Sequence, residues 1–334
     1  MPAGEFDLIA AIKERLPRPG PRVKLASGDD AAVVEPRAAS AITVDAVVDG
    51  VHFRLDRFGA RAAGRKALAA ALSDLAAMGA AQGEAYVVVA APSELSDDDL
   101  LEIADGLAEV AERESVSIAG GDLVSSPVLI ISITAIGYEP GHHRLVTRAG
   151  ARPRDVLALT GELGGAAAAL ELLTGSQPRN PISAELRHSL LAPQLDPVPR
   201  LREGRALGAA GARAMIDISD GLGADAGHLA RSSECRLEID LDRVPLARGA
   251  VEVAGEGEAA LELAAGGGED YELLVALPPD RLDAAMVAVA EAGTRLTEIG
   301  YVTEGQGVAL RLPGGRELEP TGFDQRRGSL SGSG

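Results

Sequence analysis

The chain has 334 residues, of which 46% are hydrophobic and 25% are charged, and its formal net charge at pH 7 is −18. This balance is typical of a globular protein with more than one domain, and the negative charge argues against nucleic acid or an anionic membrane as the main partner, because phosphate groups would repel the chain. The single cysteine, Cys235, excludes an intramolecular disulfide, and no apolar run reaches the ~18 residues of a membrane-spanning helix.

The N-terminal residues carry acids where a secretory signal would carry positive charge and a long apolar stretch, so we expect a cytoplasmic protein. Phe6, Ile9, Ile12 and Leu16 recur at helical spacing and predict a helix over residues 5–16. A proline-rich segment then ends this helix.

The first half continues with alternating strands and helices. In the strand predicted over residues 42–48, Ile42 and Val44 lie on one face, whereas Thr43 and Asp45 lie on the other. Apolar periodicity and a capping serine before the second helix predict the remaining elements, which are helices 62–79 and 96–114 and strands 85–92, 115–121 and 127–138.

The second half begins after the connecting segment GHHRLVTRAGARPRD, and its apolar runs predict a further α/β unit. We expect an N-terminal domain over residues 1–140, a C-terminal domain over 150–325 and a flexible tail over 326–334. The strands predicted in the second domain are 156–161, 215–219, 236–241, 271–278 and 308–313.

Acidic residues repeatedly follow apolar or glycine-containing segments. In LASGDDAAVV, Asp29 and Asp30 follow a glycine, a pattern that by itself is typical of a turn. The pattern recurs, which predicts that several carboxylates converge on one site. The other five junctions are ITVDAVVDGVHF, ALSDLAAMGA, SIAGGDLV, MIDISDGL and GGGEDYELL.

Asp74 is the most informative of these acids. Its helical neighbours at three and four positions, Ala70, Ala71, Ala77 and Met78, are all apolar. A carboxylate on a buried surface needs a partner or a metal ion. The alternative is a solvent-facing acid on an alanine-rich helix, because alanine is a weak indicator of burial.

Three other acids lie in or at the ends of strands. Asp45 lies beside Thr43, whose hydroxyl suits a hard cation, and Asp122 follows two glycines that would let a ligand approach the backbone. Asp217 lies within an apolar strand pattern. After it, Ser219 or Asp220 can cap a helix, whose N-terminus could also bind phosphate through backbone N–H groups.

Oxygen ligands without a cysteine cluster or a histidine pair are typical of a site for Mg²⁺ or Mn²⁺, and magnesium usually accompanies phosphate. The common phosphate-binding loops are missing. None of the three lysines follows a glycine, GLGADAG has the wrong glycine spacing for a dinucleotide fingerprint, and LTGELGGAAAAL is best explained as strand-to-helix packing.

Eight segments in chain order carry a resemblance to a known family: GEFDLI (4–9), GDDAAV (28–33), TVDAVVDGVHF (43–53), KALAAALSDLAAMGA (66–80), GGD (120–122), LVTRAGARPRD (145–155), IDISDGL (216–222) and GGEDYELL (267–274). Together they closely resemble the thiamine-monophosphate kinases, which belong to the ATP-binding superfamily of aminoimidazole ribonucleotide synthetase. The resemblance covers the chain to about residue 324.

The resemblance implies a two-domain α/β fold of the α+β type, with an N-terminal domain that dimerises through a shared sheet or barrel and a C-terminal domain that closes the active site. It implies direct in-line transfer of a phosphoryl group from ATP to thiamine monophosphate, giving thiamine diphosphate, with several Mg²⁺ ions as cofactors. The acceptor phosphate is already ionised and needs no general base.

The resemblance also implies roles for individual residues. Substrate contacts are His52, Glu269 and Phe323, although His52 could instead be a structural residue at a strand end. The implied ATP contacts are Gly121, Asp122, Arg148 and Ser219. The implied metal ligands are Asp30, Thr43, Asp45, Asp74, Asp122, Asp217 and Asp220.

The chain departs from the family at Ala71, where asparagine is frequent, and in its last segment, where Phe323 is the aromatic candidate for contact with thiamine. Two other functions stay open at this point. One is another ATP-dependent synthetase of the same superfamily, and the other is a non-catalytic acidic protein that binds cations.

Overall fold

The computed structural model describes residues 5–26, 31–37 and 39–322. Its described residues divide into two compact units, of which the first contains the chain up to Leu75 and Ala81–Glu139, and the second contains Ala76–Ala80 and residues 140–322. Both units combine helices with sheets, which confirms the mixed α/β class. The domain limits at 140 and 150 stay a prediction. Among the described residues, no helix is long and apolar enough to cross a membrane.

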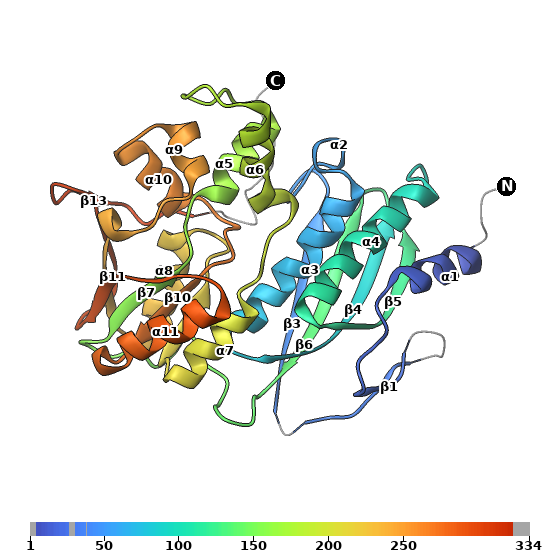
Figure 1. Cartoon of the computed structure of the whole chain (residues 1–334), viewed down its shortest axis with the longest axis horizontal. Coiled ribbons are helices and arrows are strands. Elements are labelled where there is room, and N and C mark those ends of the chain that lie inside the picture. The colour runs from blue at the N-terminus through green and yellow to red at the C-terminus, as the bar shows by residue number, and fades with distance from the viewer. Residues whose placement is uncertain (1–4, 27–30, 38, 323–334) are drawn as a thin grey trace. The chain divides into compact units, whose positions relative to one another are not determined.

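The first unit is built on a four-stranded sheet (Figure 1). Neighbouring strands are antiparallel except β4 and β5, which are parallel and are joined by helix α4 (Asp97–Glu114). A parallel pair requires such a crossover connection. The strand order is β3 (Ser40–Val48), β6 (Ile130–Tyr138), β4 (Ala81–Ala91) and β5 (Ser117–Ser125). The unit also contains α1 (Glu5–Arg15), β1 (Val23–Leu25), β2 (Val33–Val34), α2 (Leu55–Phe58) and α3 (Ala60–Ala77).

Helices α3 and α4 lie over one face of this sheet (Figure 1). They approach closely at Gly106, where a Cβ atom would lie 2.0 Å from the carbonyl oxygen of Arg61. The predicted cap of α4 is confirmed, because the Ser96 hydroxyl accepts a hydrogen bond from the backbone N–H of Asp99 at 3.1 Å. Apolar periodicity therefore explains both helices, and the serine cap explains where α4 begins.

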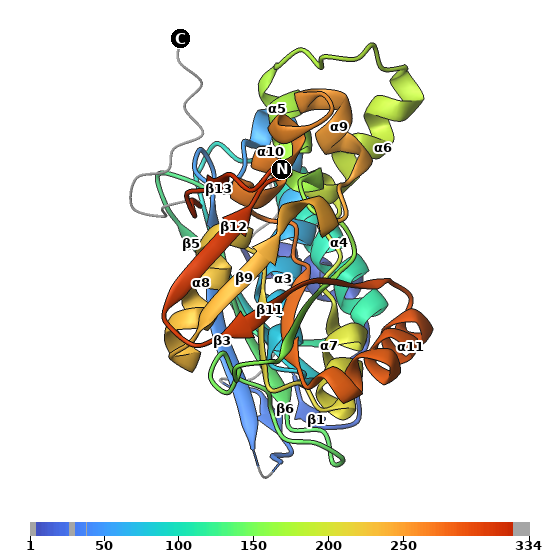
Figure 2. The ribbon, with the colours of Figure 1, turned by 90° about the vertical axis from the view of Figure 1, so that its left-hand side faces the viewer.

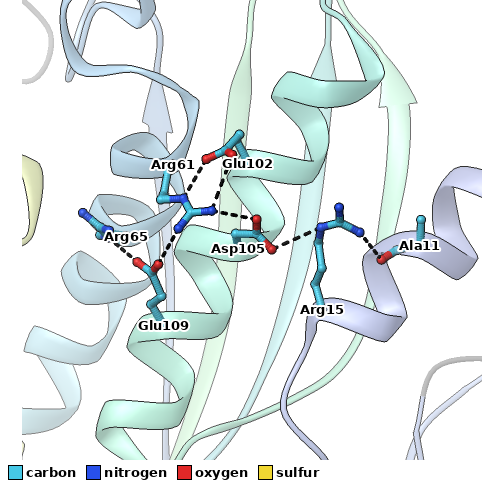
Figure 3. A network of polar contacts seen from close by, with 7 residues as sticks. All are labelled: Ala11, Arg15, Arg61, Arg65, Glu102, Asp105 and Glu109. Atoms are coloured by element: carbon cyan, nitrogen blue, oxygen red, sulfur yellow. Dashed lines mark hydrogen bonds and ion pairs between the residues drawn. The ribbon is translucent and has the colours of Figure 1, made fainter.

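A network of charged side chains joins α3, α4 and α1 (Figure 3). Arg61 lies 2.6 Å from Glu102, 2.8 Å from Asp105 and 2.8 Å from Glu109, and Arg15 of α1 lies 3.1 Å from the same Asp105. The side chains are partly exposed, so each pair stabilises the fold by about 1 kcal/mol or less.

The other face of the sheet exposes apolar side chains. Ile42 and Val44 of β3 are 63% and 69% exposed, and Val88 of β4 and Val124 of β5 are each 41% exposed. A solvated face of an antiparallel sheet normally carries polar residues. The β-branched residues on this face therefore resemble a surface that another protein covers.

The second unit is built on a seven-stranded sheet with the order β13-β12-β9-β11-β7-β10-β8. All neighbouring strands are antiparallel except β9 and β12, which Figure 2 shows side by side. The strands are β7 (Val156–Thr160), β8 (Ala214–Asp217), β9 (Arg236–Asp240), β10 (Leu273–Leu277), β11 (Leu296–Thr303), β12 (Gly307–Arg311) and β13 (Glu317–Leu318).

Helices pack around this sheet and close a core that includes Leu157, Ile216, Leu237 and Leu274. The helices are α5 (Gly165–Thr174), α6 (Ala184–Leu195), α7 (Leu201–Ala210), α8 (Leu222–Ser233), α9 (Arg248–Ala254), α10 (Glu258–Gly266) and α11 (Leu282–Ala292), with short 3₁₀ turns η1 (Leu241–Arg243) and η2 (Pro279–Arg281).

The expected strands are present, with two notable differences. The strand predicted from residue 271 begins at Leu273, because Glu269 and Tyr271 have φ values of 68° and 53°, which are incompatible with a strand. Strand β11 was not predicted, because its sequence LTEIGYVT mixes polar and apolar residues without a clear period.

Candidate functional site

The first unit brings together a hydroxyl and a carboxylate of the predicted metal site. Thr43 and Asp45 point to the helix-covered face of β3, because they pair with buried Ala135 and Ile133. The Thr43 hydroxyl donates a hydrogen bond to Asp74 of α3, and Asp45 accepts one from the backbone N–H of Ala46 at 2.7 Å. Strand β3 and helix α3 thus present these oxygen groups on one side of the sheet.

Asp74 is half-buried and its neighbours Ala70, Ala71 and Ala77 are buried. Asp74 is therefore partly enclosed by apolar neighbours, and the choice between a metal ligand and a solvent-facing acid stays a prediction. Two turns earlier on α3, Lys66 is 1% exposed and its Nζ lies 5.5 Å from the centre of the Phe58 ring. Helix α3 thus carries two charged groups into the interior of the first unit.

His52 lies in the turn that follows β3. Its Nδ1 accepts a hydrogen bond from the backbone N–H of Val48 at 3.1 Å, so a neutral His52 carries its proton on Nε2. Asp49, in the same turn, accepts a hydrogen bond from the backbone N–H of Leu55 at 2.9 Å. These contacts hold the turn in place, so His52 has the structural role that the sequence left open as an alternative. This role does not exclude a contact between the ring and a substrate.

Asp122 lies apart from Asp45 and Asp74 within the first unit. It is exposed on β5 and pairs with Val88, so it points to the apolar outer face of the sheet. Strands β6 and β4 lie between β5 and β3, so the strand that carries Asp122 is three strand spacings, or about 14 Å, from the strand that carries Asp45. The structure therefore does not gather all the predicted ligands of this unit in one place.

A cavity of about 130 Å³ lies beside Gly121 and Asp122. Its walls are mostly apolar and include Ile9, Ile12, Ile103 and Leu107. A Cβ atom at Gly121 would lie 2.3 Å from the carbonyl oxygen of Val87, so the close pairing of β5 with β4 requires glycine here. The cavity suits a flat, mostly apolar ring beside the Gly121 backbone, whereas the Asp122 side chain points to the opposite face of the sheet.

In the second unit, the segment after β8 gathers three carboxylates. Asp217 is 2% exposed at the end of β8, and Asp225 of α8 is 3% exposed. Burial, together with the negative charges of Asp217 and Asp220, raises the pKa of Asp225 to about 7, although hydrogen bonds from the backbone N–H groups of Asp220 and Ser219 oppose the shift. Because these like charges repel, a bound cation would stabilise the cluster.

The expected caps of α8 are wrong. Its N-cap is Gly221, with no hydrogen bond from a capping side chain. The carboxylate of Asp225 instead accepts hydrogen bonds from the backbone N–H groups of Ser219, Asp220 and Gly221 at 3.0, 3.0 and 3.1 Å. An acid inside the helix therefore binds the N–H groups that the sequence suggested for phosphate. Its position in GLGADAG, four residues after Gly221, was the signal for this role.

The backbone of Arg148 is held in place, because its carbonyl oxygen accepts a hydrogen bond from the Ser233 hydroxyl at 2.8 Å. Its side chain is exposed. A guanidinium on a fixed backbone suits a phosphate group, because its planar fork binds two oxygens at once.

The segment GGGEDYELL joins the Asp217 segment through its backbone. The N–H of Glu269 donates to the carbonyl of Ser219 at 2.8 Å, and that of Tyr271 donates to the carbonyl of Ile218 at 2.9 Å. The Glu269 side chain accepts a hydrogen bond from Gln194. The predicted substrate contact Glu269 and the predicted ligands Asp217 and Asp220 therefore lie on adjoining segments.

The two other acids of this segment have structural partners. Asp270, half-buried at the wall of a cavity of about 490 Å³, accepts hydrogen bonds from the N–H groups of Gly164 and Ala166 at 2.7 and 2.9 Å, and burial raises its pKa to about 7. Glu272 pairs with Arg200 at 2.5 Å, and burial raises the pKa of Glu272 although Arg200 opposes the shift. Sequence reasoning missed both roles.

Two predicted site residues, Asp30 and Phe323, lie outside the described residues. Within the part of the chain that the structure describes, no group of three or more His, Cys, Asp or Glu side chains is arranged to hold a metal ion. The expected ligands are divided between the two units. Their donor atoms, carboxylates and one hydroxyl, are nevertheless the kind that Mg²⁺ prefers.

Residues 28–138 match the N-terminal domain of AIR synthase related proteins, and residues 152–313 match the C-terminal domain of the same family. The chain is 36% identical over 327 residues to the thiamine-monophosphate kinase of Caulobacter vibrioides, an alignment that covers 96% of this chain and 90% of the relative.

Two solved structures are also similar. The thiamine-monophosphate kinase of Stenotrophomonas maltophilia K279a has a TM-score of 0.81 and 35% identity, over 93% of this chain and 97% of that one. AaThiL complexed with AMPPCP and TMP has a TM-score of 0.75 and 32% identity, over 96% of each chain.

Proposed function

Because this chain belongs to the AIR synthase related family and, within it, to the thiamine-monophosphate kinases, we propose that it phosphorylates thiamine monophosphate with ATP. An acceptor phosphate oxygen attacks the γ-phosphorus of ATP, and the bond from that phosphorus to the β–γ bridging oxygen breaks. ADP leaves with the electron pair and thiamine diphosphate forms. The observation that carries the proposal is the match along 96% of the chain to AaThiL, which was solved with AMPPCP and TMP.

The oxygen groups of both units support a role for Mg²⁺. Asp45, Asp74 and Thr43 would bind metal from the first unit, and Asp217 and Asp220 from the second, with Asp30 and Asp122 completing the set. Bound Mg²⁺ would neutralise phosphate charge. The repulsion within the Asp217 cluster supports this assignment, because a cation would relieve it.

For ATP, we assign contacts to Gly121, Asp122, Arg148 and Ser219. The mostly apolar cavity next to Gly121 supports binding of the adenine ring in the first unit, and the exposed guanidinium of Arg148 supports contact with phosphate. For thiamine monophosphate, we assign His52, Glu269 and Phe323. The Glu269 carboxylate could accept a hydrogen bond from the amino group of the pyrimidine ring.

A coupled assay of ADP release tests the proposed reaction, with thiamine diphosphate measured by chromatography in the same samples. We expect both products in equal amounts, only when Mg²⁺, ATP and thiamine monophosphate are all present. Unphosphorylated thiamine is the control acceptor and should give no product. ADP release that does not depend on thiamine monophosphate would overturn the proposal.

We also propose a homodimer that buries the apolar outer face of the first sheet. Ile42 and Val44 are the most exposed apolar residues of this face, and Asp122 lies on the same face, so an interface here would place its carboxylate beside the second copy. The test is the molar mass by light scattering of wild type, Val44→Glu and the control Val287→Glu, which changes an equally apolar residue that is 60% exposed in the second unit. We expect monomers only for Val44→Glu; a dimeric Val44→Glu variant would exclude this interface.

A further inference from the structure

The side chain of Gln194 is enclosed near the end of α6 and is 1% exposed. Its Nε2 donates one hydrogen bond to Glu269 Oε2 at 2.7 Å and another to the carbonyl oxygen of Ala166 at 3.2 Å. Both partners only accept hydrogen bonds, so the carboxamide nitrogen and not its oxygen must face them. This pairing fixes the orientation of the Gln194 amide.

The backbone next to the Glu269 side chain is anchored at the same turn of α5. Glu269 has a φ of 68°, and the following residue, Asp270, binds the backbone N–H groups of Gly164 and Ala166. The Ala166 N–H binds the Asp270 side chain, and the Ala166 carbonyl oxygen binds Gln194, which in turn binds the Glu269 side chain. The backbone end of Glu269, through Asp270, and its carboxylate end, through Gln194, are therefore both held by the turn that begins α5.

We propose that Gln194 is a positioning residue that sets the direction of the Glu269 carboxylate and thereby the affinity for the acceptor. The inference rests on the proposed function. The pyrimidine of a thiamine phosphate carries an exocyclic amino group, and a carboxylate accepts its hydrogen bond well only in a suitable direction. Loss of the Gln194 donor removes one hydrogen bond that orients the Glu269 carboxylate, so more of its ordering has to occur when the acceptor binds, and that ordering weakens binding.

The experiment compares wild type with Gln194→Met, which keeps the length of the side chain and removes its donors. We expect KM for thiamine monophosphate to rise about tenfold, as for a lost hydrogen bond to a charged group, whereas kcat and KM for ATP change less than about twofold. Ser189→Ala is the control, because Ser189 lies on the same helix, is exposed and donates its hydroxyl hydrogen bond within the helix to the carbonyl oxygen of Leu186.

A double-mutant cycle with Glu269→Gln separates positioning from a general structural role. If Gln194 acts through Glu269, Gln194→Met should raise KM for thiamine monophosphate much less in the Glu269→Gln background. An unchanged KM in Gln194→Met, an equal effect in both backgrounds, or parallel losses of kcat and ATP affinity would overturn the inference. Wild type without acceptor-dependent ADP release would instead overturn the proposed function itself.

Discussion

The acids of the two units follow similar sequence patterns but have different surroundings. In the first unit, Asp74 is half-buried and accepts a hydrogen bond from a hydroxyl group. Asp122 is exposed and accepts one from the neighbouring backbone N–H. In the second unit, Asp225 and Asp270 each accept hydrogen bonds from several backbone N–H groups at the start of a helix. The first arrangement leaves carboxylates for a ligand, whereas the second uses them to hold the polypeptide.

The largest effect on activity is expected from Asp122→Ala in the first unit. Turnover should fall at least about 100-fold if this carboxylate binds metal and nucleotide, while the melting temperature stays unchanged because the side chain is exposed. ADP release and thermal unfolding measure the two quantities. The control is the exposed Asp98→Ala. Near-wild-type turnover in Asp122→Ala would remove its assigned role and the contrast between the units.

Asp225→Ala in the second unit should show the opposite balance, with a large loss of stability. Three backbone N–H groups would lose their acceptor, and we expect the free energy of unfolding to fall by about 3 kcal/mol. Denaturant unfolding checks this value, with Asp242→Ala as an exposed control in the same unit. A change below about 0.5 kcal/mol would show that Asp225 does not hold this segment.

Asp270→Asn should change how stability depends on pH. The pKa of Asp270 is about 7 in the folded chain and near 3.8 when unfolded, so between these values the unfolded chain has released a proton that the folded chain keeps. This group therefore lowers stability as pH rises from about 4 to 7.

Asn cannot titrate, so the stability of the variant relative to wild type should rise across that range, by about 4 kcal/mol for a pKa difference of about 3 units, and then stay constant. Melting temperatures of both proteins from pH 4.5 to 8 measure the difference. Parallel curves would mean that the carboxylate of Asp270 keeps an ordinary pKa, and that burial next to the cavity hardly destabilises its charged form.

Arg61→Met should have the smallest effect. Arg61 contacts Glu102, Asp105 and Glu109, but its side chain is 40% exposed, so we expect a loss of about 1 kcal/mol in dilute buffer that disappears in 1 M salt. Unfolding at both salt concentrations checks this, with Arg57→Met as the control for a single exposed ion pair. A loss that persists in salt would show that Arg61 stabilises the α3–α4 contact through packing.

Most of the fold could be predicted from the sequence, because apolar periodicity determines the long helices and the buried strands. Strand β11 could not, because it is a strand through its pairing with β7 on one side and β9 on the other. The start of β10 was misplaced for a related reason. Tyr271 has strand-forming chemistry, but its hydrogen bond to Ile218 holds it at a positive φ.

Individual acids of the candidate site could be predicted, but the sequence did not show which acids face a ligand and which bind backbone N–H groups. Asp74 and Asp217 were singled out because acids interrupt apolar patterns there, and the structure encloses them at least in part. The position of Asp225 four residues after Gly221 was an unused local signal of its role, whereas Asp270 binds N–H groups that only the folded chain brings near it, so no local pattern shows its partners. Gln194 was missed for the same reason, because 75 residues separate it from Glu269.

Lys66 lies enclosed beside the ring of Phe58, whereas Lys13 and Lys24, the other two lysines of the chain, are exposed. A reagent that acylates amines should therefore modify positions 13 and 24 quickly and reach position 66 only when α2 and α3 separate. The rate of labelling at Lys66, read by mass spectrometry, would report local opening of the first unit. Because the chain has three lysines and Lys66 is the buried one, its labelling rate alone would measure how often the first unit opens near Phe58.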